Sequence, residues 1–306
     1  MTPETRGALL MSAAMLGFAI EDALFKAATA TVSPGLGTLI FGLGGLVLYA
    51  ALVRRAGLPV WTRAYLSRTM LLRSGFEVTG RLFYALALAF APLSVTSAIL
   101  QAAPLVVTLG AALALAEPVG ARRWLAMGIG FVGVLLILRP SAEGFEASAL
   151  FAVLGMIGFA GRDVATRASP PEISTTQLGI PGFATVTLAG LVILAFEPGL
   201  PAMPQPAAAG LLAATAVTGV VAYGALTQAM RTGAVAVVAP FRYTRLIAAL
   251  VLAYVVFGER PDALMLAGAG LIVGSGLYTL WHSGRGSGQM RAAALDAGPS
   301  EKDHAP

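Results

Sequence analysis

Long apolar runs, separated by short polar or Pro- and Gly-rich breaks, make up most of the chain. Each run holds about 20 mostly apolar residues, which is the length that an α-helix needs to cross the hydrocarbon core of a bilayer. The runs are continuously apolar rather than alternating, so they favour helices over the strands of a membrane β-barrel. The pattern therefore predicts an all-α membrane protein with ten transmembrane helices. The predicted spans are 7–29, 35–53, 69–90, 93–115, 122–138, 147–168, 175–196, 207–230, 233–257 and 262–282.

The two ends of this pattern need separate interpretation. Residues 1–20 have features of a secretory signal peptide, with Arg6 ahead of an apolar stretch. The apolar run continues to Ala30, however, which is long enough to span a bilayer, so we expect a retained first helix. Residues 283–306 are polar and rich in Gly and Ser, which predicts a disordered tail.

Composition supports the membrane interpretation and excludes several functional classes. Of the 306 residues, 57% are hydrophobic and 11% charged, against about 25% charged in soluble domains. The mean hydropathy of +0.81 also excludes a disordered chain. The chain has no Cys, and its two His, His282 and His304, lie near the C-terminal end. We therefore expect no catalytic residue, no metal site and no cofactor, and the protein is not predicted to be an enzyme.

Basic residues are concentrated in alternate loops, which predicts the orientation. With the N-terminus in the cytoplasm, the outer loops hold only Arg139 and Arg260. The sequence pI of 9.9 reflects this bias in short loops and indicates no nucleic-acid partner. Both termini are predicted to be cytoplasmic. The predicted cytoplasmic segments include 1–5, 56–66, 118–121 and 283–306.

The second half of the chain repeats the first. Residues 15–27 match residues 156–168 at a shift of 141, and the match includes a polar Asp-x-x-x-Lys/Arg pattern. The turn at Glu117 matches the turn at Glu259 at a shift of 142. These shifts predict a duplicated five-helix unit. Because five is odd, the second copy must enter the membrane from the opposite side, which gives an inverted repeat.

Further motifs give the repeat a family resemblance. Each half has a Pro-containing fourth helix, an acidic turn and a Gly-rich final helix. The turns are 116–118 (Ala-Glu-Pro) and 258–260 (Gly-Glu-Arg), and 239–244 reads Ala-Pro-Phe-Arg-Tyr-Thr. Over residues 7–282 the chain resembles the EamA-type drug/metabolite transporter superfamily, and its closest likeness is to the YddG-type amino-acid exporters. The first acidic turn departs from the pattern, because it lacks the Gly of the usual Gly-Glu pair.

The resemblance implies the organisation of the molecule. It implies a first EamA-like repeat over 1–140 and a second, inverted one over 146–282, and it implies that helices 1, 3, 4, 6, 8 and 9 surround a central cavity. One motif points elsewhere: residues 128–133 match the Gly-x-Gly-x-x-Gly dinucleotide fingerprint. That motif needs a preceding strand, whereas these glycines lie inside an apolar helix, so we interpret them as helix-packing residues.

Charged residues inside the spans are costly and therefore mark functional candidates. Asp22 and Lys26, and the repeat pair Asp163 and Arg167, are one helical turn apart. They are interpreted either as structural ion pairs or as parts of the outer and inner gates. Near mid-depth lies a second set, which either binds substrate or forms a structural network. Its members are Glu77, Arg81, Tyr84, Gln101, Tyr223, Arg242, Tyr243 and Arg245.

The sequence is therefore interpreted as a secondary transporter that exports amino acids across the inner membrane by alternating access. Arg242 or Arg245 is expected to hold a carboxylate, and Glu77 an ammonium group. S-adenosylmethionine or another cationic metabolite is the alternative substrate, and a lipid flippase or a non-transporting scaffold is the alternative of another class. The expected partners are a small-molecule substrate and the bilayer, and a monomer is expected to suffice.

Overall fold

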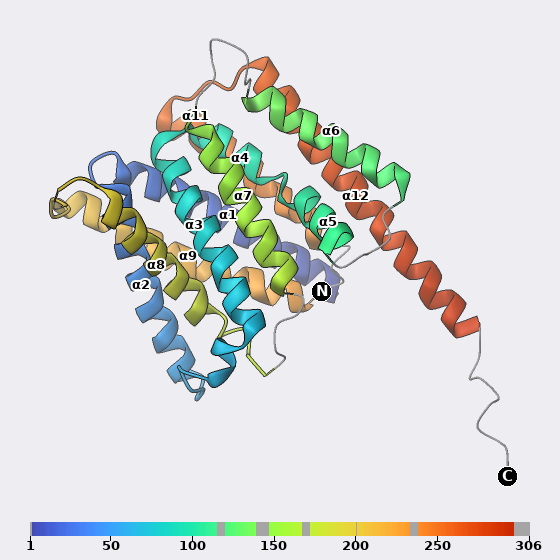
Figure 1. The fold of residues 1–306 in the computed structure, drawn as a ribbon, viewed down its shortest axis with the longest axis horizontal. Coiled ribbons are helices and arrows are strands. Elements are labelled where there is room, and N and C mark those ends of the chain that lie inside the picture. Colours follow the sequence, from blue (N-terminus) through green and yellow to red (C-terminus); the bar gives the residue numbers. More distant parts are fainter. Residues whose placement is uncertain are drawn as a thin grey trace.

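The fold is built from helices (Figure 1). Each of the ten predicted spans contains helix in its described part, and the described residues contain no strand, which confirms the predicted fold class. The computed structural model describes residues 2–114, 120–138, 147–166, 172–199, 201–232 and 238–296.

The two halves contain corresponding series of elements. The first half contains α1 (Pro3–Thr29), α2 (Pro34–Arg55), the 3₁₀ helix η1 (Arg63–Leu66), α3 (Arg68–Phe90), α4 (Leu93–Leu100), α5 (Ala103–Ala114) and α6 (Ala121–Leu138). The second half contains α7 (Ala149–Thr166), α8 (Gly179–Phe196), α9 (Pro206–Thr232), the 3₁₀ helix η2 (Ala239–Tyr243), α11 (Thr244–Phe257) and α12 (Ala263–Asp296).

Local sequence explains where several helices begin and end. The side chains of Thr2 and Ser33 accept backbone N–H groups at the starts of α1 and α2, and a proline follows each of them. Proline suits the first helical position because its missing N–H would have no partner there. Gly258 ends α11 with a φ of 65°, a left-handed conformation that glycine adopts readily.

The fourth span differs from the continuous helix predicted over 93–115. It is interrupted between Leu100, where α4 ends, and Ala103, where α5 begins. Pro104 contributes to the break, because proline has no N–H to donate to the carbonyl of Leu100. In the second half, η2 precedes α11 and contains Pro240. Broken helices of this kind commonly place backbone and polar side chains beside a transporter cavity.

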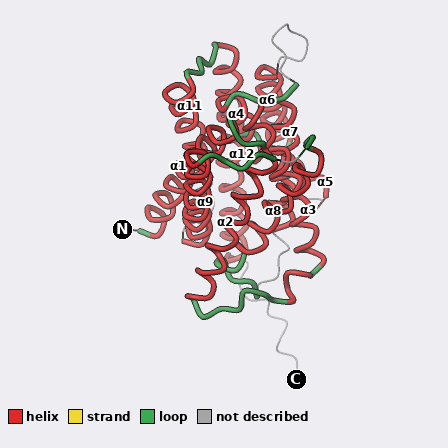
Figure 2. The backbone as a smooth tube through the Cα atoms, turned by 90° about the vertical axis from the view of Figure 1, so that its left-hand side faces the viewer, coloured by secondary structure: helices red, strands yellow, loops and turns green. Residues whose placement is uncertain are grey.

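The helix pairs agree with a two-fold relation between the repeats. The most extensive contacts join α1 to α9, α3 to α7, α2 to α8, and α6 to α12 (Figures 1 and 2). Exchanging the repeats converts the first pair into the second and leaves the other two unchanged. Two close approaches between helices obey the same rule: a methyl group added at Gly17 would lie 2.9 Å from Cβ of Ala222, and one at Gly158 would meet the backbone of Gly80. Small residues let the helices approach this closely.

The corner between α3 and α4 is held from two sides. Lys26 of α1 donates to the carbonyl oxygens of Leu88 (3.2 Å) and Ala91 (2.6 Å), at the end of α3. Glu259, from the second half, accepts from the backbone N–H groups of Leu93 (2.7 Å) and Ser94 (2.9 Å). Each charge complements the dipole of the helix end that it contacts. The repeat partner, Glu117, lies outside the described residues.

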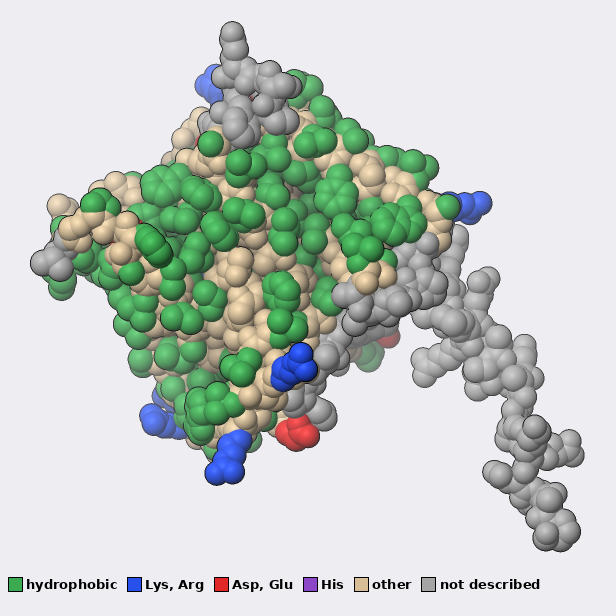
Figure 3. All heavy atoms as spheres, viewed as in Figure 1, with side chains coloured by type: hydrophobic (Ala, Val, Ile, Leu, Met, Phe, Trp, Pro, Cys, Tyr) green, Lys and Arg blue, Asp and Glu red, His purple; other side chains and the backbone are tan. Residues whose placement is uncertain are grey.

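The outer surface suits a bilayer. Hydrophobic side chains cover the centre of the face in Figure 3, with Lys and Arg side chains at its margins. Val47, Val221 and Val255 are each more than half exposed. Within the described ranges, six apolar segments are long enough to cross a membrane. α3 is also long, but its charged residues Arg68, Arg73, Glu77 and Arg81 lower its hydropathy.

The C-terminal segment differs from its prediction. The sequence predicts disorder from residue 283, whereas α12 continues to Asp296. Three consecutive alanines at 292–294 have high helix propensity and favour this continuation. Residues 297–306 lie outside the described part of the chain.

Candidate functional site

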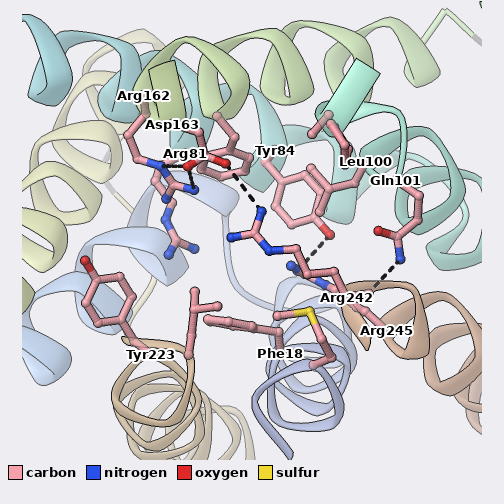
Figure 4. Close-up of a pocket in the computed structure, with 15 residues that line it drawn as sticks. Phe18, Arg81, Tyr84, Leu100, Gln101, Arg162, Asp163, Tyr223, Arg242 and Arg245 are labelled. Atoms are coloured by element: carbon pink, nitrogen blue, oxygen red, sulfur yellow. Dashed lines mark hydrogen bonds and ion pairs between the residues drawn. The ribbon is translucent and has the colours of Figure 1, made fainter. Parts of the chain in front are cut away.

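A cavity lies where the two halves meet, with about 100 Å³ of water-accessible space. This is ample for several waters or a small solute. Its wall combines aromatic rings with guanidinium groups (Figure 4). The lining residues are Met15, Phe18, Arg81, Tyr84, Leu100, Gln101, Ala103, Pro104, Phe159, Arg162, Asp163, Tyr223, Leu226, Arg242 and Arg245.

Asp163 and Arg242 form the most loosely held ion pair at this cavity. Asp163 lies on α7 and Arg242 on η2, and an Arg242 nitrogen is 3.6 Å from a carboxylate oxygen of Asp163. Their side chains are 25% and 30% exposed, more than those of the other ion-paired residues here. In Figure 4 the two charged groups point toward one another across the cavity. Both groups are therefore accessible to a solute.

Arg162 also lines the cavity, but its guanidinium group is fixed. It lies 2.8 Å from Asp163 and 3.2 Å from Glu77. Glu77 is completely buried and pairs with Arg73, one turn earlier on α3, at 2.9 Å. Arg162 also packs over the ring of Phe159. Glu77 therefore acts on the cavity indirectly, by holding Arg162 in place.

Arg245 is held by a second buried carboxylate. Its Nη2 lies 2.6 Å from Asp22 Oδ2 and 3.2 Å from the hydroxyl of Tyr84. The Tyr84 hydroxyl in turn donates to Asp22 at 3.0 Å. The Arg245 guanidinium also contacts the rings of Phe18 and Tyr84. Because α1 and α3 belong to the first half and α11 to the second, this cluster joins the halves.

Arg81, another of the four arginines that line the cavity, is also loosely held. Its Nη1 is 3.5 Å from Glu21, and its Nε has no hydrogen-bond partner among the described residues. The Arg81 guanidinium lies over Phe159, at 5.4 Å from the ring centroid. The protein atoms around Arg81 therefore leave one of its donors unsatisfied.

The structure brings most of the predicted substrate-binding residues to one cavity. Two residues of the predicted set do not line it: Glu77 and Tyr243. Glu77 faces α7 instead, because its ion pair with Arg162 turns it away from the cavity. The Tyr243 hydroxyl lies against Gly276 of α12. An ammonium group of a substrate in this cavity would therefore need a carboxylate other than Glu77. The predicted residues that line the cavity are Arg81, Tyr84, Gln101, Tyr223, Arg242 and Arg245.

The predicted gate residues are arranged differently from the sequence interpretation. Asp22 pairs with Arg245 rather than with Lys26 one turn on, because a guanidinium group from α11 reaches it. Lys26 caps the end of α3. Asp163 lines the cavity, and Arg167 lies outside the described residues. Their assignment as gates stays a prediction.

Glu21 and Arg162 add to the charged residues that the sequence singled out. They occupy equivalent positions in the two repeats, with opposite charge. In the structure Glu21 lies beside Gly219, and Arg162 pairs with Glu77, which is the repeat equivalent of Gly219. Where the second repeat has Arg162 in place of a glutamate, the helix packed against it thus has a carboxylate, Glu77, in place of a glycine. Within the described ranges, no three His, Cys, Asp or Glu residues are grouped as a metal site would need.

Known proteins resemble this chain over most of its length. The model of the EamA-like transporter family matches residues 5–139 and 147–281. The chain is 28% identical to a riboflavin transporter of Rhizobium johnstonii, over 90% of each chain. It is 29% identical to the pseudopaline exporter CntI of Pseudomonas aeruginosa, over 87% of this chain and 93% of the relative.

Two further proteins match the chain over different shares of its length. An S-adenosylmethionine uptake transporter of Rickettsia bellii is 27% identical, over 63% of this chain and 66% of the relative. A solved crystal structure superposes with a TM-score of 0.62 at 21% identity, over 89% of this chain and 95% of that chain. At this identity the superposition shows a common fold.

Proposed function

Because the chain belongs to the EamA-like transporter family, and is thus a multi-pass membrane protein that carries small metabolites, we propose that it transports amino acids. The proposed direction is export across the bacterial inner membrane, by alternating access. The observation that carries this proposal is the loose ion pair between Asp163 and Arg242. It offers one accessible charge of each sign, as a zwitterion requires.

A zwitterion would replace this ion pair by two stronger contacts. The substrate carboxylate would accept from Arg242, and its ammonium group would donate to Asp163. Charge-assisted hydrogen bonds are strongest near 2.7–2.9 Å, so little is lost by separating groups that are 3.6 Å apart. Asp163 thus takes the role that the sequence assigns to Glu77. One chain supplies all the lining residues, so we propose that a monomer suffices.

The cavity charges bear on the alternatives. Four arginines line the cavity against one carboxylate, Asp163. This surface repels a cation such as S-adenosylmethionine, the substrate named for the Rickettsia relative. A lipid flippase would need an apolar groove open to the bilayer, which a wall of guanidinium groups does not provide. Riboflavin and pseudopaline, named for two other relatives, enter the test as competitors.

The proposal is tested by counterflow in proteoliposomes. Vesicles that contain the purified protein and unlabelled alanine should accumulate labelled alanine, and external amino acids should inhibit this. S-adenosylmethionine and riboflavin should inhibit weakly. Empty vesicles and vesicles with an unrelated membrane protein provide the background. Counterflow of S-adenosylmethionine or riboflavin without counterflow of any amino acid would overturn the proposal.

We further propose that both termini are cytoplasmic, as the loop charges favour. The chain has no Cys, so single cysteines report their side of the membrane directly. Ala56→Cys follows α2 and is exposed, and Met203→Cys lies between α8 and α9, where Met203 is 89% exposed. A membrane-impermeant maleimide should label Met203→Cys in intact cells and Ala56→Cys only after permeabilisation. The reverse labelling pattern would contradict the orientation.

A further inference from the structure

The arginines of the cavity divide into two that are fixed and two that are loosely held. Arg162 and Arg245 each have a carboxylate oxygen within 2.8 Å. For Arg81 and Arg242 the corresponding distances are 3.5 Å and 3.6 Å. A guanidinium group has five N–H donors in a rigid fork, so distant partners leave donors for a ligand. Arg81 and Arg242 are therefore the two positions suited to bind acidic groups.

Arg81 belongs to a subsite distinct from the Asp163–Arg242 pair. It projects from α3, whereas Arg242 projects from η2, and both line the same cavity. Figure 4 shows Arg81 on the Tyr223 side of the Arg162–Asp163 pair, away from Gln101. The repeat equivalent of Arg81 is Tyr223, which also lines the cavity but carries no charge. Of these two equivalent positions, only the one on α3 therefore carries a positive charge.

The charges around the cavity are not balanced. Among the described residues, the ion-pair network contains five guanidinium groups and four carboxylates, an excess of one positive charge. A neutral zwitterion leaves this excess uncompensated in a membrane interior, where uncompensated charge is costly. A substrate with one net negative charge neutralises it.

From these observations we propose that the cavity prefers amino acids with a second acidic group, and that Arg81 binds that group. The α-carboxylate then contacts Arg242, the ammonium group contacts Asp163, and the second carboxylate contacts Arg81. The preferred class is the dicarboxylic amino acids, of net charge −1. This inference rests on the proposed function, since it uses the same cavity and the same zwitterion contacts.

The test compares labelled glutamate and alanine in proteoliposome counterflow. The wild-type protein should prefer glutamate by about tenfold or more, the contribution of one added charge-assisted hydrogen bond. Arg81→Gln should lower the ratio of glutamate to alanine counterflow by about tenfold, and Arg81→Lys should restore part of it. Arg54→Gln, at the exposed end of α2, is the matched control and should retain the wild-type ratio.

A second measurement does not depend on the folding of any variant. On the wild-type protein, glutarate, which has two carboxylates, should inhibit alanine counterflow more strongly than butyrate, which has one. Equal inhibition by the two acids, a wild-type preference for alanine, or an unchanged ratio in Arg81→Gln would overturn the assignment of Arg81. Absence of counterflow for both amino acids would instead overturn the proposed function, together with this inference.

Discussion

Replacing Arg242 with Gln should slow counterflow of labelled alanine by about 10- to 100-fold. Arg242 is the most exposed of the ion-paired arginines, and the variant removes the proposed contact with the substrate carboxylate. A hydrogen bond to a charged group contributes about 1.5–3 kcal/mol, which corresponds to that range. The measurement is initial counterflow at subsaturating alanine, with Arg260→Gln, an exposed residue after α11, as the matched control. Wild-type rates in Arg242→Gln would place the carboxylate elsewhere.

The partner residue provides a sharper test of the zwitterion geometry. Asp163→Asn should weaken inhibition by alanine more than inhibition by propionate, because propionate has no ammonium group to donate a hydrogen bond to Asp163. Arg242→Gln should weaken both inhibitors. Residues that share a ligand and contact each other are not independent, so the double variant should lose less than the product of the two single effects. If Asp163→Asn weakened both inhibitors equally, the ammonium site would lie at another residue.

Asp22→Asn should destabilise the protein strongly, whatever it does to transport. Asp22 is 1% exposed and holds Arg245 at 2.6 Å, so the variant leaves a guanidinium group without its counter-ion. Breaking a buried ion pair costs about 3–5 kcal/mol. For a protein of this size that corresponds to a fall in Tm of about 5–10 °C. Thermal unfolding of the purified protein in detergent measures it.

A double variant distinguishes two causes of the lower stability: the lost attraction between Asp22 and Arg245, and the cost of leaving the Arg245 guanidinium group without a counter-ion. Adding Arg245→Met to Asp22→Asn removes the unpaired guanidinium group and should recover part of the lost stability. Glu4→Gln, at the exposed start of α1, is the matched control and should leave Tm nearly unchanged. A double variant that is no more stable than Asp22→Asn would show that the pair with Arg245 is not the cause.

The helices could be predicted because each span is a local property of the chain. A run such as 175–196 is apolar for long enough to cross a bilayer, and no distant residue changes that requirement. The repeat was likewise readable, since residues 15–27 and 156–168 carry the same polar pattern. The interruption after Leu100 was not predicted, because the run over 93–115 stays apolar across it.

The candidate site was only partly predictable from the sequence. Ion-pair partners that are close together in the sequence could be predicted, whereas partners that are far apart in it could not. Arg73 and Glu77 are four residues apart on one helix, so their common face is readable from the sequence, and they pair at 2.9 Å. Asp22 and Arg245 are 223 residues apart, and the sequence favoured the nearer Lys26. Local spacing identifies possible partners, but it does not rank them against residues from other helices.

The sequence alone therefore determined the helical architecture, the inverted duplication and most of the charged residues near mid-depth. Only the tertiary structure decided which of these charges meet: Glu77 faces Arg162 in the interior, and Asp163 faces Arg242 at the cavity. The reason is geometric. Helical periodicity defines which residues share a face of one helix, whereas the packing of all the helices decides which face meets a partner and which meets water.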